Sequence, residues 1–183
     1  MSVIQSLLYI QALKMDEPTL RKVLTETADR VRAMAILYEK LYQSESYNFL
    51  SLKAFLPSLI EEIKRIFQDY ISVDIDIDIE EFIVSVKSLS SIGIIINELI
   101  TNSIKYAFNK KKGMISISVH KEDNKGVLIY KDNGIGMPLQ NNIDNSSGFG
   151  MQLVDILVKQ IKGTLVIETT NGTQFTITFP LKR

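Results

Sequence analysis

The chain has 183 residues, of which 45% are hydrophobic and 23% charged. It is therefore long enough for one domain, or one domain with an appendage, and apolar enough for a buried core. Its 21 basic residues equal its 21 acidic residues, which disfavours nucleic acid or an anionic membrane surface as the main partner. No apolar run has the length of a membrane span, and the start lacks the features of a signal peptide. The lack of cysteine and the single histidine, His120, exclude disulfides, thiolate metal sites and multi-histidine metal sites.

Two amphipathic helices are predicted at the start of the chain. The first runs from Met1 to about Lys14, and Pro18 opens the second. Their apolar faces exceed what one hairpin covers, so we expect residues 1–46 to form a homodimer through a four-helix bundle. The alternative is that the hairpin packs against its own globular domain. The second helix has a heptad pattern, with alternating spacings of four and three, at Leu20, Leu24, Thr27, Val31, Met34, Tyr38 and Leu41.

Residues 47–183 are predicted to form an α+β domain. The order of elements indicates a sandwich with helices on one face of a mixed sheet. Asp74, Asp76 and Asp78 alternate with isoleucines and form the solvated face of a strand, since Ile79 stands where a calcium loop requires glycine. The predicted helices are 52–70, 88–108 and 149–162, and the predicted strands are 73–79, 115–120, 127–131, 164–169 and 174–179, with a hairpin turn at 123–126.

The helix from Ser88 to Phe108 has two kinds of face. One face is apolar, and Ser103 belongs to it by helical spacing. Glu98, Asn102 and Lys105 stand at i, i+4 and i+7, which places a carboxylate, an amide and an ammonium in one row on another face. Taken alone, such a row is typical of a solvated helix face.

Two glycine-bearing segments follow this helix. Asp132 ends a predicted strand and precedes Gly134 and Gly136, so a flat ligand could approach the backbone while the carboxylate accepts a hydrogen bond from it. The exocyclic amine of adenine suits that acceptor, whereas guanine presents an oxygen at the same edge. Gly148 and Gly150 open the next helix, where free backbone N–H groups attract phosphate. Each segment alone is also typical of an ordinary turn, and the common phosphate-loop motif is absent.

The order of four segments is more specific than any one of them. They read N-E-L-I-T-N-S-I-K-Y-A, D-N-G-I-G-M, S-G-F-G-M-Q-L-V and N-G-T-Q-F-T-I-T-F-P. This series strongly resembles the nucleotide-binding domain of sensor histidine kinases, in the superfamily that also holds DNA gyrase, the heat-shock chaperone of that class and the mismatch-repair ATPases. The resemblance covers roughly Leu52 to Arg183.

The resemblance implies an ATP site between the long helix and a lid at Leu139–Ser147. It implies that Asn102 offers its amide oxygen to Mg²⁺ and that Asp132 accepts a hydrogen bond from the adenine amine. By the same correspondence, Glu98 polarises the attacking nucleophile, Lys105 contacts phosphate, Tyr106 flanks the nucleotide, Gly134 and Gly136 allow its close approach, Gly148 and Gly150 bind the phosphates, and Thr173 makes a water-linked contact beside Asp132. Phosphoryl transfer needs mainly such positioning and charge neutralisation.

The N-terminal hairpin resembles the dimerisation and phosphoacceptor helices of one histidine kinase branch. Ser6-Leu7-Leu8-Tyr9-Ile10-Gln11 matches the end of that pattern, so the acceptor histidine would fall just before Met1. The resemblance implies a cytoplasmic kinase core with an upstream sensor domain and a response regulator receiver domain as its partner. We expect this chain not to phosphorylate itself, because His120 lies on a strand of the catalytic domain. The alternatives are a stand-alone kinase or ATPase of the superfamily, such as an anti-sigma-factor-like serine kinase, and a non-catalytic dimerisation module.

Overall fold

The computed structural model describes residues 3–42, 49–67, 72–108, 112–137 and 149–181. The chain divides into two compact units, Met1–Glu45 and Ser46–Arg183. Each unit is described by itself. The expected lid at 139–147 lies outside the described residues.

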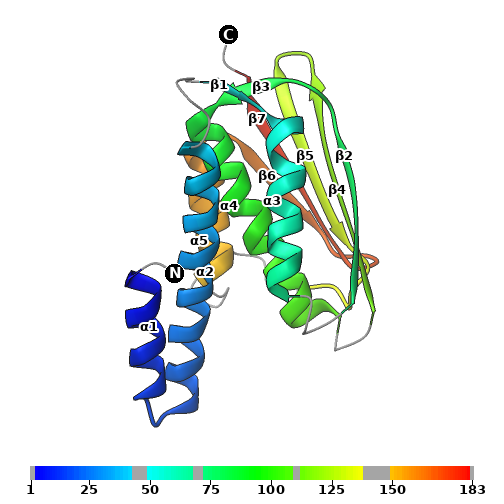
Figure 1. Cartoon of the computed structure of the whole chain (residues 1–183). Coiled ribbons are helices and arrows are strands. Elements are labelled where there is room, and N and C mark those ends of the chain that lie inside the picture. The colour runs from blue at the N-terminus through cyan, green and yellow to red at the C-terminus, as the bar shows by residue number, and fades with distance from the viewer. Residues whose placement is uncertain (1–2, 43–48, 68–71, 109–111, 138–148, 182–183) are drawn as a thin grey trace. The chain divides into compact units, whose positions relative to one another are not determined.

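The first unit is a helical hairpin, as predicted. Its helices are α1 (Val3–Leu13) and α2 (Pro18–Tyr42), shown in blue in Figure 1. The small side chains of Ala12 and Ala28 are buried, and the Tyr9 hydroxyl on α1 donates a hydrogen bond of 2.6 Å to Asp29 Oδ1 on α2. A row of large apolar side chains stays exposed, namely Val3, Ile4, Leu7, Ile10 and Leu13 of α1 and Leu20 and Val23 of α2.

The second unit is built on a mixed five-stranded sheet in the order β2-β4-β5-β7-β6. Strand β2 pairs with β4 in parallel, and the other three pairings are antiparallel. The strands are β2 (Val73–Ile79), β4 (Gly113–Glu122), β5 (Lys125–Asp132), β6 (Thr164–Glu168) and β7 (Thr173–Pro180). Two further strands, β1 (Phe49–Ser51) and β3 (Ile83–Ser85), pair with each other and were not predicted. Strands of three residues are too short for periodicity to reveal.

Three helices cover one face of the sheet, which confirms the predicted α+β sandwich (Figure 1). They are α3 (Leu52–Phe67), α4 (Val86–Asn102) and α5 (Phe149–Gln160). Ser85 caps the N-terminus of α4: its hydroxyl accepts from the Ser88 N–H at 3.1 Å and so satisfies one of the free donors of the first turn. Most of α4 is buried, unlike the half-exposed helix that a stripe pattern describes. Its fully buried apolar side chains include Leu89, Ile92, Ile95, Ile96 and Ile100.

The end of α4 departs from the predicted regular helix. Residues Ser103–Ala107 form a π-helical segment, η1, in place of further α-helix. Its i to i+5 hydrogen bonds change the angle between successive side chains, and such segments occur often at functional sites. The predicted spacing of seven residues from Glu98 to Lys105 therefore does not describe an ideal α-helical row.

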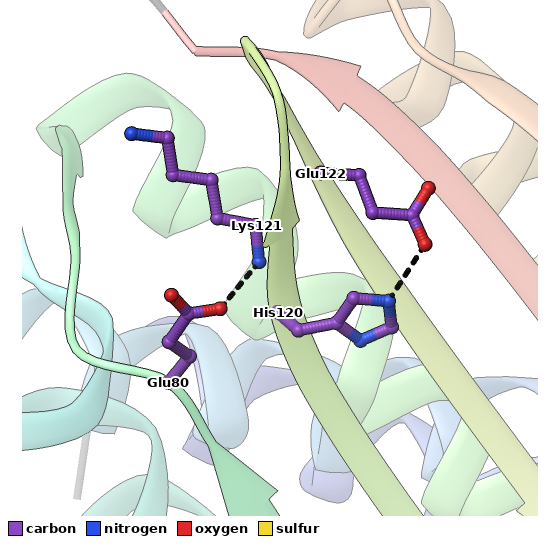
Figure 2. Close-up of polar contacts among 4 residues, drawn as sticks. All are labelled: Glu80, His120, Lys121 and Glu122. Carbon is purple, nitrogen blue, oxygen red and sulfur yellow. Dashed lines mark hydrogen bonds and ion pairs between the residues drawn. The ribbon is translucent and has the colours of Figure 1, made fainter.

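The opposite face of the sheet is open on β2 and β4. Asp74, Asp76 and Asp78 are exposed there, which confirms the solvated strand face. Figure 2 shows His120 on this part of β4, where its Nε2 lies 3.1 Å from Glu122 Oε1. The neighbouring Lys121 N–H donates to Glu80 Oε2 at 2.7 Å. His120 is thus a surface strand residue, as predicted.

Candidate functional site

The centre of the candidate site is the Asp132 carboxylate at the end of β5. Its side chain is only 3% exposed. Three protein groups donate to it: Oδ1 accepts from the backbone N–H of Gly134 at 2.9 Å and of Thr173 at 3.2 Å, and Oδ2 accepts from the Ser103 hydroxyl at 2.8 Å. No ion pair with a lysine or arginine is found for Asp132 among the described residues. The arrangement is a buried anionic acceptor held by neutral donors, and buried charges need such hydrogen bonds to be tolerated.

Sheet register explains why Thr173 reaches this carboxylate. Asp132 and Thr173 are directly paired between β5 and β7. The residue before Thr173 is Gly172, which has a φ of +81° and packs against the Asp132 backbone carbonyl. An added Cβ would collide with that oxygen and would lie 2.8 Å from the carbonyl carbon. Gly172 is therefore a residue of the candidate site that sequence reasoning missed, although it lies in the segment N-G-T-Q-F-T-I-T-F-P.

The turn after Asp132 packs against the end of η1. The Ile135 N–H donates to the Ala107 carbonyl at 3.0 Å. A Cβ at Gly134 would lie 2.7 Å from that same carbonyl oxygen and would also collide with the Ala107 side chain. Gly136 has a φ of +80° but more space, since its nearest neighbours would lie at 3.4 Å. At Gly134 the close approach that glycine permits is therefore an approach of protein to protein.

Asn102 stands at the last residue of α4 and is half-buried. Its Nδ2 donates to the sulfur of Met151 at 3.7 Å, which brings the amide to the first turn of α5. That turn contains Gly150, which is buried, and Phe149, which is 64% exposed. Gly148 lies outside the described residues. The structure thus places the Asn102 side chain beside the first turn of α5.

The other predicted residues of the long helix differ in exposure. Glu98 is 0% exposed, so the simple alternative of a solvated Glu98 on a helix face is wrong. Lys105 is half-buried and Tyr106 is 50% exposed, and both lie within η1. Lys105 and Tyr106 therefore follow α4 on a segment whose geometry differs from that of Glu98 and Asn102.

Two side chains that sequence reasoning missed complete the surroundings of Asp132. Ser103 was assigned to the apolar face of the helix, and its hydroxyl is in fact the donor to Oδ2. Tyr130, two residues before Asp132 on β5, donates to Ser103 Oγ at 2.8 Å and to the Leu99 carbonyl at 3.1 Å. Burial raises the pKa of the Tyr130 hydroxyl well above its ordinary value. A serine within an apolar stripe was the one signal in the sequence, since a buried hydroxyl needs a partner.

The described ranges contain neither a cluster of metal-ligating side chains nor a helix that could cross a membrane. Within them, no group of three or more histidine, cysteine, aspartate or glutamate side chains could hold a metal ion. In the same residues, every helix is too short or too polar to cross a membrane.

Two family models match the chain, one over its N-terminal third and one over its C-terminal half. Residues 1–67 match a family model described as histidine kinase. Residues 89–183, about half of the chain, match the model described as histidine kinase-, DNA gyrase B-, and HSP90-like ATPase.

Individual proteins show the same likeness. A sensor histidine kinase of Mycolicibacterium smegmatis, PdtaS, is 25% identical over 194 aligned residues that cover all of this chain but only 38% of the relative. Sensor histidine kinase ComP of Bacillus subtilis is 32% identical over 81 residues, 44% of this chain and 10% of the relative. The histidine kinase domain of a blue-light-activated histidine kinase of Erythrobacter litoralis superposes with a TM-score of 0.74 at 19% identity, covering 97% of this chain and 95% of that one. The chain spans well under half the length of these two sequence relatives.

Proposed function

Since the chain belongs to the family of histidine kinase-, DNA gyrase B- and HSP90-like ATPases, we propose that its second unit binds Mg-ATP and transfers the γ-phosphate to a protein histidine. The first unit matches the histidine kinase model, so the two parts occur in the order of a sensor histidine kinase core. Because His120 is the one histidine of the sequence and lies on a surface strand, the acceptor is a histidine outside these 183 residues.

The observation that carries the proposal is the burial of Asp132 and the hydrogen bonds that its carboxylate accepts. Asp132 is 3% exposed and its carboxylate accepts from three neutral donors. A carboxylate has about four acceptor sites, so it can accept a further hydrogen bond from a ligand. An amine-bearing nucleobase supplies the missing donor, and a 6-oxo purine meets the carboxylate with a second acceptor. The other end of the nucleotide then falls toward Asn102 and the start of α5, where helix N–H groups favour phosphate.

Asn102 is the residue of the candidate site that we propose as a ligand of Mg²⁺. Asn102 uses its amide nitrogen toward Met151, and the amide oxygen is the atom that a hard cation prefers. Mg²⁺ commonly takes few protein ligands and completes its shell with water and phosphate oxygens. We assign Asn102 as its protein ligand, and the ion would neutralise charge on the transferred phosphate.

Roles for the remaining predicted residues are part of this proposal. Glu98 would polarise the attacking nucleophile and Lys105 would contact phosphate, while Tyr106 flanks the nucleotide. Gly134, Gly136 and Gly150 shape the surroundings of the ligand, and Gly148 would contribute to phosphate binding.

The partners are also proposed. The exposed apolar row on α1 and α2 supports a homodimer through the N-terminal helices, because exposed apolar residues in a row mark interaction surfaces. A response regulator receiver domain would take the phosphate, a sensor domain would lie upstream, and the kinase core would act in the cytoplasm.

Calorimetric titration with Mg-ATP and Mg-GTP, on the wild type and on Asp132→Asn, tests the nucleotide site. The wild type should prefer ATP. The introduced amide can still accept from Gly134 and Thr173, but its NH₂ group faces the adenine amine, donor against donor. We expect ATP affinity to fall by about 10- to 100-fold, the cost of one hydrogen bond to a charged group.

Asp78→Asn is the matched control, because Asp78 is exposed on β2 and the same change of charge there should leave ATP binding unaltered. Wild-type protein that binds neither nucleotide would refute the site. An Asp132→Asn variant with unchanged ATP affinity would refute the assignment of this carboxylate.

Labelling with γ-labelled ATP tests the transfer. We expect acid-labile phosphate on an added chain that carries the acceptor histidine, and none on this chain. Acid-stable phosphate on a partner would favour the serine kinase alternative, against which the N-terminal hairpin now counts. Nucleotide binding with no transfer to any added chain would favour the non-catalytic alternative.

A further inference from the structure

We propose that Tyr130 and Ser103 act as a positioning pair that makes Asp132 selective for an amino-bearing purine over a 6-oxo purine. This inference rests on the proposed nucleotide site and adds to it two residues that do not touch the ligand themselves. They act by fixing where each hydroxyl hydrogen points.

The three side chains form one buried line. The Tyr130 hydroxyl lies 2.8 Å from Ser103 Oγ, and Ser103 Oγ lies 2.8 Å from Asp132 Oδ2. Their exposed fractions are 0%, 3% and 3%. Competition from bulk water is therefore small, and each hydrogen bond has a stronger effect on its neighbour than it would at the surface.

The chemistry of the three groups fixes the direction of this line. A carboxylate only accepts, so the single hydrogen of Ser103 must point to Asp132. Ser103 Oγ is then an acceptor toward Tyr130, which donates. Burial holds the pKa of the Tyr130 hydroxyl well above its ordinary value, so this donor keeps its proton across the physiological range.

Tyr130 also lies beside the acceptor that Ser103 would otherwise use. A serine inside a helix commonly donates to the carbonyl four residues earlier, and for Ser103 that residue is Leu99. Ser91 on α4 does this, donating to the Lys87 carbonyl at 3.1 Å. The Tyr130 hydroxyl lies 2.8 Å from Ser103 Oγ and 3.1 Å from the Leu99 carbonyl, so its single hydrogen is shared between the two acceptors. The Ser103 hydroxyl donates to Asp132 Oδ2 instead.

The consequence for a ligand follows from the remaining acceptor sites. Oδ1 of Asp132 accepts from the two backbone N–H groups of Gly134 and Thr173, and Oδ2 accepts from Ser103. The hydrogens of these three donors all point at the carboxylate oxygens. None of the three is therefore available to donate to a ligand carbonyl. A ligand amine can donate to Oδ2, whereas a ligand carbonyl meets only acceptors. If Ser103 turned to Leu99, a water could enter its place and donate to the carbonyl.

The test compares Mg-ADP with Mg-IDP, whose base has a carbonyl in place of the amine. Dissociation constants are measured by calorimetry for the wild type, Ser103→Ala, Tyr130→Phe and the double variant. We expect each single variant to lose about tenfold of the preference for ADP, the size of one hydrogen bond to a charged group. Because Tyr130 acts through Ser103, Tyr130→Phe should change nothing further in the Ser103→Ala background.

Matched controls separate this effect from general damage to the fold. Ser91→Ala removes another buried serine hydroxyl of α4, and Tyr9→Phe removes a tyrosine hydroxyl in the other unit. Both should keep the wild-type preference. Ser103→Cys, with a weaker donor of similar size, should fall between wild type and Ser103→Ala and gives a second reading if Tyr130→Phe does not fold.

Each other outcome overturns the inference in a recognisable way. An unchanged ADP-to-IDP ratio in Ser103→Ala would show that the serine does not set selectivity. Additive losses in the double variant would show that Tyr130 does not act through Ser103. Wild-type protein that binds neither nucleotide would instead refute the proposed nucleotide site, and this inference with it.

Discussion

Replacing Gly172 by alanine tests whether the turn between β6 and β7 is what holds Thr173 against Asp132. Gly172 and Gly136 form a matched pair, because their φ angles are +81° and +80°. Alanine therefore meets the same torsional strain at both positions. The two sites differ in space: a Cβ at Gly136 would lie 3.4 Å from its nearest neighbours, whereas at Gly172 it would collide with the Asp132 carbonyl.

The expected magnitudes follow from this difference. A left-handed conformation costs an L-residue roughly 1–2 kcal/mol, so Gly136→Ala should lower the free energy of unfolding by about that amount. Overpacking typically adds about 1–3 kcal/mol, and the atoms in the way at Gly172 are backbone, which cannot rotate aside. We expect Gly172→Ala to cost about 2–5 kcal/mol in total.

Urea unfolding of the full chain measures both costs when it is followed by the amide resonances of β5 and β7. The slope of the free energy of unfolding against urea should stay constant, so that a shift in midpoint reports stability. Nucleotide affinity should fall with Gly172→Ala, because its collision is with Asp132, the residue that we propose binds the base. Equal losses of stability in the two variants would refute the argument that the turn presses on Asp132.

Two further predictions concern the N-terminal hairpin. Partial burial and the hydrogen bond to Asp29 raise the pKa of Tyr9 from 10.0 to about 12. The protonated hydroxyl therefore stabilises the folded hairpin, fully so below pH 10. This contribution to the free energy of unfolding is lost as the pH rises through about 12. Urea unfolding of the hairpin at pH 9 and pH 12 should show a stability loss that is smaller in Tyr9→Phe, and an equal loss would contradict the assignment. Leu7→Glu places a charge in the exposed apolar row and should shift the chain from dimer to monomer in sedimentation velocity. Lys14→Glu, which lies outside the row, should leave the dimer intact. A monomeric wild-type protein would contradict the proposed dimer.

Much of the fold could be predicted from periodicity. Strand β2 was predicted with its observed bounds, because alternation over seven residues has no helical reading. The buried helix α4 was also predicted, from the spacing of its isoleucines. Periodicity did not give the end of this helix, where the π-helical segment η1 begins at Ser103. The last residue of η1, Ala107, accepts a hydrogen bond from Ile135 in a distant part of the sequence, a contact that a local pattern cannot reveal.

The site was predicted unevenly for a similar physical reason. Asp132 could be singled out because it stands where a predicted strand ends before two glycines. Asn102 could be singled out because it shares a helix row with Glu98 and Lys105 and lies in a segment that resembles the family. Ser103 and Tyr130 could not, because each fits a core position by spacing, and only the tertiary structure shows that their hydroxyl groups meet. A polar group at a core position needs a hydrogen-bond partner. A serine or tyrosine at such a position next to a motif is therefore as good a candidate for a site residue as the motif itself.

The glycines of the candidate site lead to a more general point about motifs. Sequence reasoning gave Gly134 to the ligand, yet the space beside it is filled by Ala107, and Gly172 is pressed against Asp132 itself. Both glycines let segments far apart in the chain converge on one carboxylate. Gly134 itself supplies one backbone N–H to that carboxylate, and Gly172 precedes Thr173, which supplies the other. A glycine requirement here thus reflects how the protein holds its acceptor. In the proposed site, chemical selectivity would reside in the carboxylate and its hydroxyl neighbours, which is why the double variant of Ser103 and Tyr130 tests more of this site than any glycine substitution.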